Sequence, residues 1–207
     1  MNPFFSIWTH PSKTIRYIIE QKSTLYPLML ISISSLGTSI MAFADTGFFA
    51  DLSLSSTITL ILLLSLLSGI AGWGIASFAY TWFGKLLGGT GTPKKMAHAI
   101  GATTIPAIWT APIGIIAVSL YGKQLFEAPS GMFGTNMNFV FFLFQTWIIL
   151  GISIFGLIIL SKGIGIVHDF SAWRGFGTIL LFTGFMFVIS IIILGSLFSI
   201  FLFIGFI

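Results

Sequence analysis

Residues 56–83 read STITLILLLSLLSGIAGWGIASFAYTWF, and residues 84–95 read GKLLGGTGTPKK. The first stretch carries no charged residue and is longer than the roughly 20 residues that a helix needs to cross a hydrocarbon core. The second places Lys85, Lys94 and Lys95 among glycines and a proline, which are typical of a turn. A long apolar helix followed by a short basic turn indicates a membrane-spanning protein.

The composition of the whole chain agrees. Of its 207 residues, 56% are hydrophobic and 7% are charged, and the mean hydropathy is +1.06. Such a chain cannot cover a water-soluble domain with polar surface. We therefore predict an all-α integral membrane protein without a separate soluble domain. The chain has no cysteine, which excludes disulfides, a thiol nucleophile and cysteine-ligated metals.

Five apolar stretches are long enough to cross a membrane. They run over Leu25 to Ala44, Ser56 to Phe83, Met96 to Leu120, Asn138 to Ser161 and Gly177 to Phe206. An odd number of spans puts the two termini on opposite sides. The third span contains Pro106 and Pro112 among threonines, so we expect a kinked helix in which nearby threonine hydroxyls or a water satisfy the freed carbonyl groups.

Eight of the nine basic residues lie in three segments between spans. These residues are Lys13, Arg16 and Lys22; Lys85, Lys94 and Lys95; and Lys162 and Arg174. The alternate gaps hold Asp45, Asp51, Lys123 and Glu127. The positive-inside rule therefore predicts a cytoplasmic N-terminus and an external C-terminus. The basic inner face should also favour anionic lipid headgroups.

Residues 1–24 are predicted to form a cytoplasmic and interfacial segment ahead of a five-helix domain over residues 25–207. Pro11 suits the first turn of a helix, and Ile15, Ile18 and Ile19 form an apolar stripe opposite Lys13 and Arg16. We expect this amphipathic helix to lie in the inner interface with its stripe on lipid. The alternative is that the stripe docks a partner.

Small residues predict where helices pack closely. In the second span, Ser65 and Gly69 form one pair at helical spacing, and Ser68, Gly72 and Ala76 form a ridge four residues apart. Gly88 and Gly89 lie in the inner turn that follows. Thr92 is the expected N-cap of the third span, with Pro93 at its first helical position.

The sequence carries little sign of catalysis. No Asp, Glu, Lys or Arg lies at the centre of a span, which argues against a proton relay or an ion-coupled transporter. The glycine-rich turn lacks the Gly-Lys-Ser/Thr ending of a phosphate loop, and no HExxH pair occurs. We predict no enzyme and no cofactor. The basic residues are split among short segments, so we also expect no nucleic-acid partner.

Three histidines are predicted to share the inner face. His10, His98 and His168, with Asp169, could together ligate zinc or copper. They are far apart and lack the spacing of a ligand set. We therefore predict no metal site and expect ordinary hydrogen bonds instead.

Several segments resemble the bacterial members of the Yip1 domain family. They are the opening NPFFSIWTHP (residues 2–11), the turn FGKLLGGTGT (83–92), Pro106 in the third span, and KGIGIVHDFS (162–171) followed by Trp173 and Arg174. This resemblance covers almost the whole chain. It implies a five-helix membrane protein without established catalytic residues, some of whose bacterial relatives assist membrane transport or defence complexes.

Three functions are compatible with these features. The first is a membrane adaptor that binds another membrane protein, or a second copy of itself, through small-residue helix faces. The candidate interaction and packing residues are Ser68, Gly72, Ala76, Gly88, Gly89, Pro106, Trp173 and Arg174. The second is a channel or permease for a small neutral solute, with Gln145 and Thr146 facing the kinked third span. The third is a protein that binds or shapes lipid through the amphipathic helix and Lys94 with Lys95. In each case membrane lipids are partners, and the bacterial cell membrane is the expected location.

Overall fold

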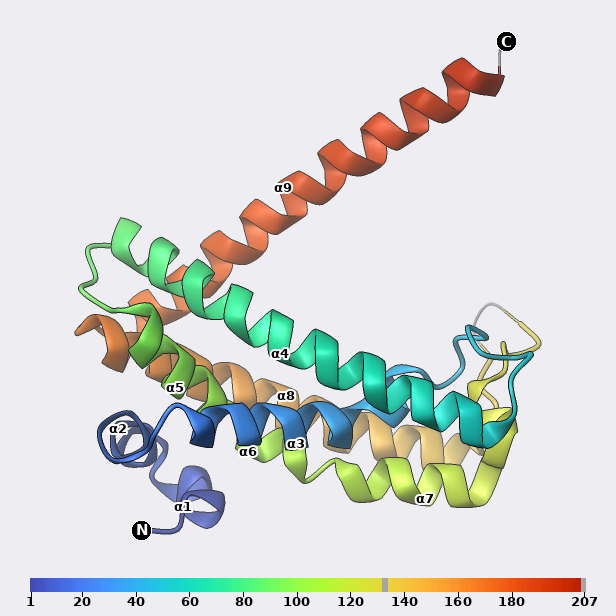
Figure 1. Ribbon diagram of the computed structural model, residues 1–207, viewed down its shortest axis with the longest axis horizontal. Helices are drawn as coiled ribbons and strands as arrows, with labels where there is room; N and C mark the ends of the chain where they lie inside the picture. The colour runs from blue at the N-terminus through green and yellow to red at the C-terminus, as the bar shows by residue number, and fades with distance from the viewer. Residues whose placement is uncertain (132–133, 206–207) are drawn as a thin grey trace.

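The computed structural model describes residues 1–131 and 134–205, and the regular structure in these ranges is helical. Among these residues, four helices are long and apolar enough to cross a membrane, and they run over Leu25–Ala42 (α3), Leu54–Leu86 (α4), Phe139–His168 (α8) and Ala172–Gly205 (α9). They lie roughly along one direction, except that α9 diverges (Figure 1). The expected end of the last span, Phe206, falls outside the described residues.

The third span is divided into short helices, and the predicted kink lies at this break. It consists of α5 (Pro93–Thr103), α6 (Ile105–Ile108) and α7 (Ala111–Tyr121), and its two halves are bent by 42°. If this bent pair is one span, the described part of the chain has five candidate spans. The hydroxyls of Thr103 and Thr104 donate to the carbonyl oxygens of Ile100 and Gly101 at 2.7 and 2.9 Å. The threonines thus supply backbone partners at the break, as expected of a helix interrupted by proline.

Helix α5 lies at the centre of the bundle. Residues 96–102 are all buried, and α5 contacts α2, α3, α4 and α8. The Nε1 of Trp73 on α4 donates to the carbonyl oxygen of Ala97 at 2.8 Å. On another side, a side chain at Gly101 would overlap Pro27 of α3. Thr92 caps α5 through the N–H of Lys95, with Pro93 in the first turn, as predicted.

The N-terminal segment forms two helices, α1 (Pro3–Thr9) and α2 (Pro11–Gln21). The sequence predicts that the apolar stripe of α2 meets lipid, and this prediction is wrong. Ile15 and Ile18 have no exposed surface and join one apolar core with residues of α5 and α8, including Ile164. Since α2 packs against α5 and α8, its stripe is covered by protein. The exposed aromatic residues of this segment are Phe5 and Trp8.

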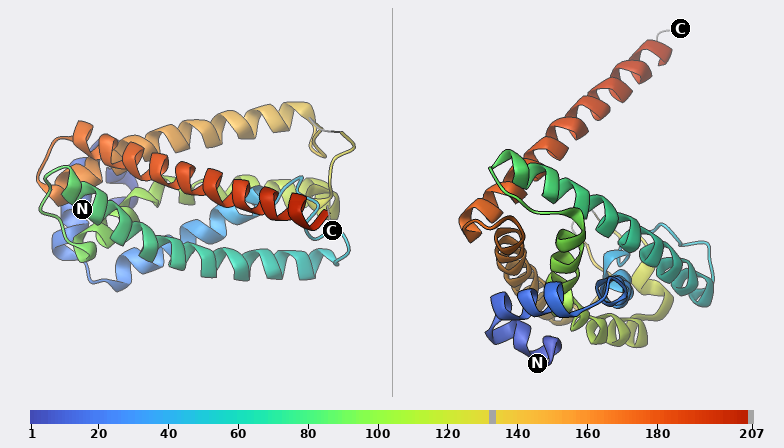
Figure 2. Two further views of the ribbon diagram at one scale, coloured as in Figure 1. Left: turned by 90° about the horizontal axis from the view of Figure 1, so that it is seen from above. Right: turned by 60° about the vertical axis from the view of Figure 1, so that its left-hand side comes forward.

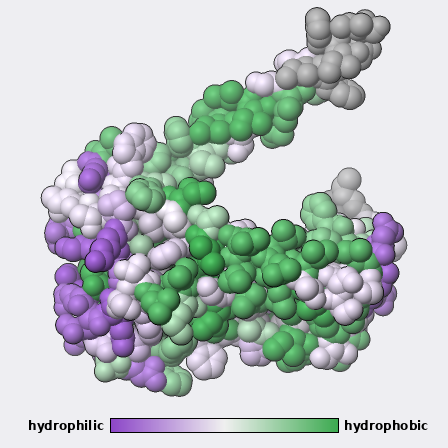
Figure 3. All heavy atoms as spheres, in the orientation of Figure 1, coloured by the Kyte–Doolittle hydropathy of each residue, from purple (hydrophilic) through white to green (hydrophobic). Residues whose placement is uncertain are grey.

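The three basic segments meet at one end of the bundle, where α1, α2, the α4–α5 turn and the α8–α9 turn lie together (Figure 1). Hydrophilic residues gather over this end in the space-filling view (Figure 3). We refer to it as the basic end. The segments that the charge pattern assigns to one side of the membrane therefore do share one end of the structure.

The opposite end is organised by Asp45, which has a left-handed backbone with a φ of 58°. Its carboxylate accepts hydrogen bonds from the hydroxyl of Thr135 at 2.7 Å and the N–H of Asn136 at 2.8 Å. Its own N–H donates to the carbonyl oxygen of Leu125 at 2.8 Å. Asp45 therefore holds the α3–α4 loop to the segment between α7 and α8.

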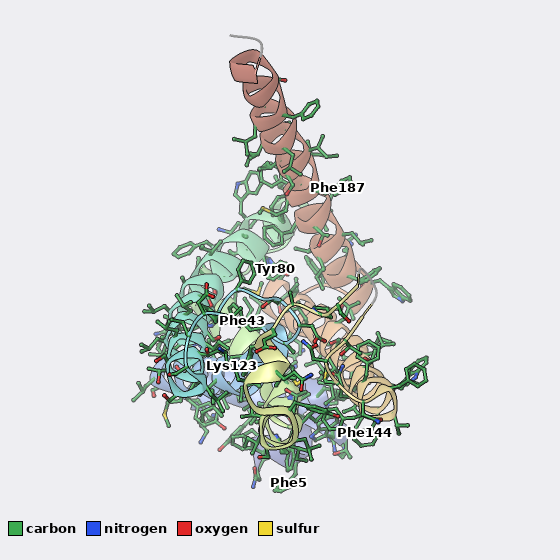
Figure 4. The ribbon with its side chains drawn as sticks, turned by 90° about the vertical axis from the view of Figure 1, so that its right-hand side faces the viewer. Phe5, Phe43, Tyr80, Lys123, Phe144 and Phe187 are labelled. Atoms are coloured by element: carbon green, nitrogen blue, oxygen red, sulfur yellow. The ribbon has the colours of Figure 1, made fainter. Side chains whose placement is uncertain are left out.

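Helix α9 leaves the bundle partway along its length (Figures 1 and 2). Near its start it packs against α8 and α4. Farther along, large apolar side chains such as Phe187 and Leu194 are more than half exposed. Figure 4 shows Phe187 on this separated part of α9 and Phe144 on the outer side of α8. The space-filling view shows an open notch between α9 and the rest of the molecule (Figure 3).

Candidate functional site

The imidazole of His168 is buried at the basic end, between the end of α8 and the glycine-rich turn after α4. Its side chain is 1% exposed. The N–H of Gly91 donates to Nδ1 at 3.1 Å, and Nε2 lies 3.3 Å from the carbonyl oxygen of Tyr80. A carbonyl only accepts, so Nε2 must carry the proton and Nδ1 must be the acceptor. Both contacts are satisfied by one neutral tautomer.

The glycines of the turn make room for this ring. A side chain at Gly84, Gly89 or Gly91 would overlap the imidazole of His168. Gly88 has a φ of +83° and no neighbouring atom within 4 Å of an added Cβ. Glycine is therefore favoured at this position by the left-handed backbone and not by lack of space. We call His168 together with residues 84–91 the histidine turn.

Two residues next to His168 reinforce the contact. Asp169 ends α8 in a left-handed conformation, and its carboxylate accepts from the hydroxyl of Thr90 at 3.4 Å. The ring of Phe170 stacks on that of His168 with centroids 5.3 Å apart. The histidine turn therefore joins the ends of α4 and α8, which are separated by about 80 positions in the sequence.

The other histidines have different partners. In His98, Nδ1 lies 2.8 Å from the carbonyl oxygen of Lys94 and Nε2 lies 3.1 Å from that of Lys22. A neutral imidazole can donate only one of these two hydrogen bonds, whereas an imidazolium can donate both. The Nδ1 of His10 contacts the hydroxyl of Thr9. In the described ranges, no three His, Asp or Glu residues are placed to hold a metal ion.

The small residues of α4 divide into two sets. Gly69 faces α3, because a side chain there would overlap Ser35. Gly72 is exposed, with no atom within 4 Å of an added Cβ, and Ser68 is exposed beside it. The predicted close approach between helices is thus made by Gly69 within the chain, whereas Ser68 and Gly72 stay uncovered on the same helix.

Comparison with known protein families gives a match to the Yip1 domain over residues 5–194. This range is nearly the whole chain and contains the histidine turn. The chain belongs to the Yip1 domain family. Its apolar helices agree with the membrane location of that family, whose members are non-enzymatic membrane proteins. Neither the curated proteins nor the solved structures give a match.

The remaining predicted site residues occupy different parts of this Yip1 domain. Pro106 is buried in the short helix α6, where it contributes to the break in the third span. Trp173 is 82% exposed, and Arg174 is exposed next to it at the start of α9. Trp173 and Arg174 lie at the basic end with the histidine turn, but Ser68 and Gly72 lie farther along α4. The predicted residues therefore do not form a single site.

The contact between His168 and the glycine turn was not predicted, although both segments contributed to the Yip1 resemblance. The signal available in the sequence was the cluster of glycines at positions 84, 88, 89 and 91. Glycines concentrated in a turn indicate that some group approaches the backbone closely. Which group it is depends on the fold.

Proposed function

We propose that this Yip1-type protein is a non-enzymatic membrane adaptor that binds another membrane protein laterally, between α4 and the separated part of α9. The proposed arrangement has the basic end in the cytoplasm and the C-terminus outside, in a bacterial cell membrane. The observation that carries the proposal is an uncovered small-residue face on α4 that continues from a face already packed against α9.

The packed part of this face is aromatic. Phe83 of α4 contacts Phe182 and Phe185 of α9, with ring centroids 5.7 and 5.5 Å apart. Gly72 precedes Phe83 by three helical turns, which places it about 20° from Phe83 around the helix axis. The two residues therefore lie on nearly the same face of α4. Helix α9 diverges from α4 beyond this contact (Figure 1), and no atom lies within 4 Å of a Cβ added at Gly72.

The separated part of α9 lies on the other side of the proposed binding site, opposite α4. Ile193 on this part of the helix is 52% exposed, and Gly195 has no atom within 4 Å of an added Cβ. Close helix packing in a membrane relies on small residues that let backbones approach. A partner helix seated against Ser68 and Gly72 would find such a surface. This geometry supports the adaptor more than a permease, because the third-span threonines donate to carbonyl groups of their own segment.

The test is crosslinking in the native membrane followed by gentle extraction and mass spectrometry. Gly72→Leu should abolish recovery of the stoichiometric partner without reducing insertion, since the new side chain blocks close approach. Gly151→Leu is the matched control, because Gly151 is also an exposed helical glycine with no atom within 4 Å of an added Cβ, but on α8. Equal recovery of the partner from wild type and Gly72→Leu would refute this binding face.

Gly88→Leu is a less direct probe of the interface. Gly88 has a φ of +83°, a conformation that costs a residue with a side chain roughly 1–2 kcal/mol. A loss of partner binding in that variant would therefore also reflect a strained turn. The Gly72 and Gly151 pair avoids this problem, because both glycines lie in helices.

A further inference from the structure

Two adjoining hollows lie where α8 turns into α9 at the basic end. The first has a volume of about 360 Å³ and an apolar lining that includes Leu157, Ile158, Trp173 and Phe176. The second, which we call the polar hollow, has a volume of about 330 Å³ and is lined by Ser12, Arg16 and Asp169 together with apolar residues such as Ile166 and Phe170. Lys162 and Ala172 line both hollows. Because the two hollows share these residues, we refer to them together as one groove with an apolar part and a charged part.

The charged part of the groove combines cations from two distant segments. Arg16 is exposed on α2, and Lys162 is half-buried on α8. They line the same hollow because α2 packs against α8. Lys95 and Arg16 also line a neighbouring hollow, together with Glu20. Two basic side chains and one carboxylate, that of Asp169, thus face the polar hollow.

Two helices also begin beside the polar hollow. Ser12 lies in the first turn of α2 and Ala172 begins α9, and both residues line the polar hollow. The N–H groups in the first turn of a helix have no intrahelical partner, and they favour anions. The first turns of α2 and α9 therefore line the same hollow as the side chains of Arg16 and Lys162.

We propose that this groove binds one anionic glycerophospholipid with a hydroxylated headgroup. Its phosphodiester lies between Arg16 and Lys162, a headgroup hydroxyl donates to the carboxylate of Asp169, and an acyl chain follows the apolar hollow toward Phe176. Basic pockets between helices on the cytoplasmic side bind anionic headgroups in this way. The exposed indole of Trp173 beside the groove suits the headgroup level of the membrane. This site is separate from the proposed adaptor face on α4.

The test uses the purified full-length protein in a mild detergent. Phosphatidylglycerol and phosphatidylcholine are titrated in turn, and retained lipid is counted by native mass spectrometry. Wild type should retain one phosphatidylglycerol in preference to phosphatidylcholine. A basic residue near an anionic lipid contributes about fivefold in affinity, so the Arg16→Gln and Lys162→Gln double variant should bind roughly thirtyfold more weakly. Each single variant should bind about fivefold more weakly.

Lys13→Gln is the matched control, since Lys13 is an exposed basic residue on α2 that is absent from the lining of either hollow. It should leave phosphatidylglycerol binding nearly unchanged. The charge-conserving variant Lys162→Arg should retain binding, which separates loss of charge from loss of fold. Ile158→Trp should also weaken binding, because the larger side chain fills the apolar hollow.

Four results would overturn the proposal. They are unchanged binding in the double variant, an equal loss in Lys13→Gln, equal retention of phosphatidylcholine, and displacement of the lipid by inorganic phosphate at matched concentration. The last result would indicate a site for free anions. None of these results depends on whether Gly72→Leu loses its protein partner, so this proposal and the adaptor proposal can fail separately.

Discussion

The N–H of Gly91 donates a hydrogen bond to Nδ1 of His168 across 77 positions of sequence, with the two nitrogen atoms 3.1 Å apart. The same ring occupies the space that a side chain at Gly84 or Gly89 would fill. The ring of His168 is therefore enclosed by the backbone of the glycine-rich turn on several sides, and it links the ends of α4 and α8 at the basic end.

His168→Ala should destabilise the protein by about 3 kcal/mol. The change leaves the buried N–H of Gly91 without its acceptor and opens a cavity in place of the ring. His168→Asn should recover part of the loss, because its side-chain oxygen can accept near the position of Nδ1. Thermal unfolding in detergent, followed by circular dichroism, measures both variants. Wild-type stability in His168→Ala would contradict the role assigned to the ring.

Gly84→Ala should be destabilising, whereas Gly74→Ala should be neutral or slightly stabilising. Both glycines lie in α4, but a Cβ at Gly84 overlaps His168 and one at Gly74 has no neighbour within 4 Å. Alanine favours a helix over glycine by about 1 kcal/mol where no clash opposes it. The same unfolding assay compares the two variants. Equal stabilities would mean that His168 and the α4 end can move apart freely.

Asp45→Ala should loosen the end of the bundle opposite the histidine turn. The variant removes the acceptor for the Thr135 hydroxyl and the Asn136 N–H, and it places alanine in a left-handed conformation. We expect a loss of about 2–4 kcal/mol. Asp45→Asn keeps one side-chain oxygen and tolerates this conformation, so it should lose less. Hydrogen exchange of residues 134–138 would report the local loosening, and unchanged exchange would count against it.

The orientation can be tested with single cysteines, because the chain has none of its own. Ser23 lies at the basic end and Ser130 at the opposite end, and both are exposed. In intact cells a membrane-impermeant maleimide should label Ser130→Cys and leave Ser23→Cys unlabelled until the cells are opened. The reverse pattern would invert the predicted topology.

Local signals in the sequence predicted much of the fold. Thr92 with Pro93 marked the start of the third span, and Pro106 among threonines marked its break. The grouping of Lys85, Lys94 and Lys95 with the other basic segments predicted which loops share an end. Each of these features depends either on residues that are neighbours in the sequence or on the order of the spans. The sequence alone is enough to recognise both.

Contacts between distant segments were not predictable in the same way. The stripe of Ile15 and Ile18 identified an amphipathic helix, but its spacing cannot show whether lipid or protein covers it. Likewise, helical spacing placed Gly69 and Gly72 in packing ridges, but only the position of α3 shows that Gly69 is the one in contact. The partnership of His168 with Gly91 required the packing of α8 beside α4.

The central position of α5 has a consequence for how the protein is made. This helix carries Lys94, Lys95 and His98, and it qualifies as a span only together with α7. It is nevertheless buried against α8, which the ribosome produces later. Helices α2, α3 and α4 precede α5 in the chain and can cover part of its surface as it enters the membrane, whereas the side that faces α8 is covered only after α8 has been made. Because α5 is only weakly apolar, we expect it to settle into its final position late, once α8 has joined the bundle.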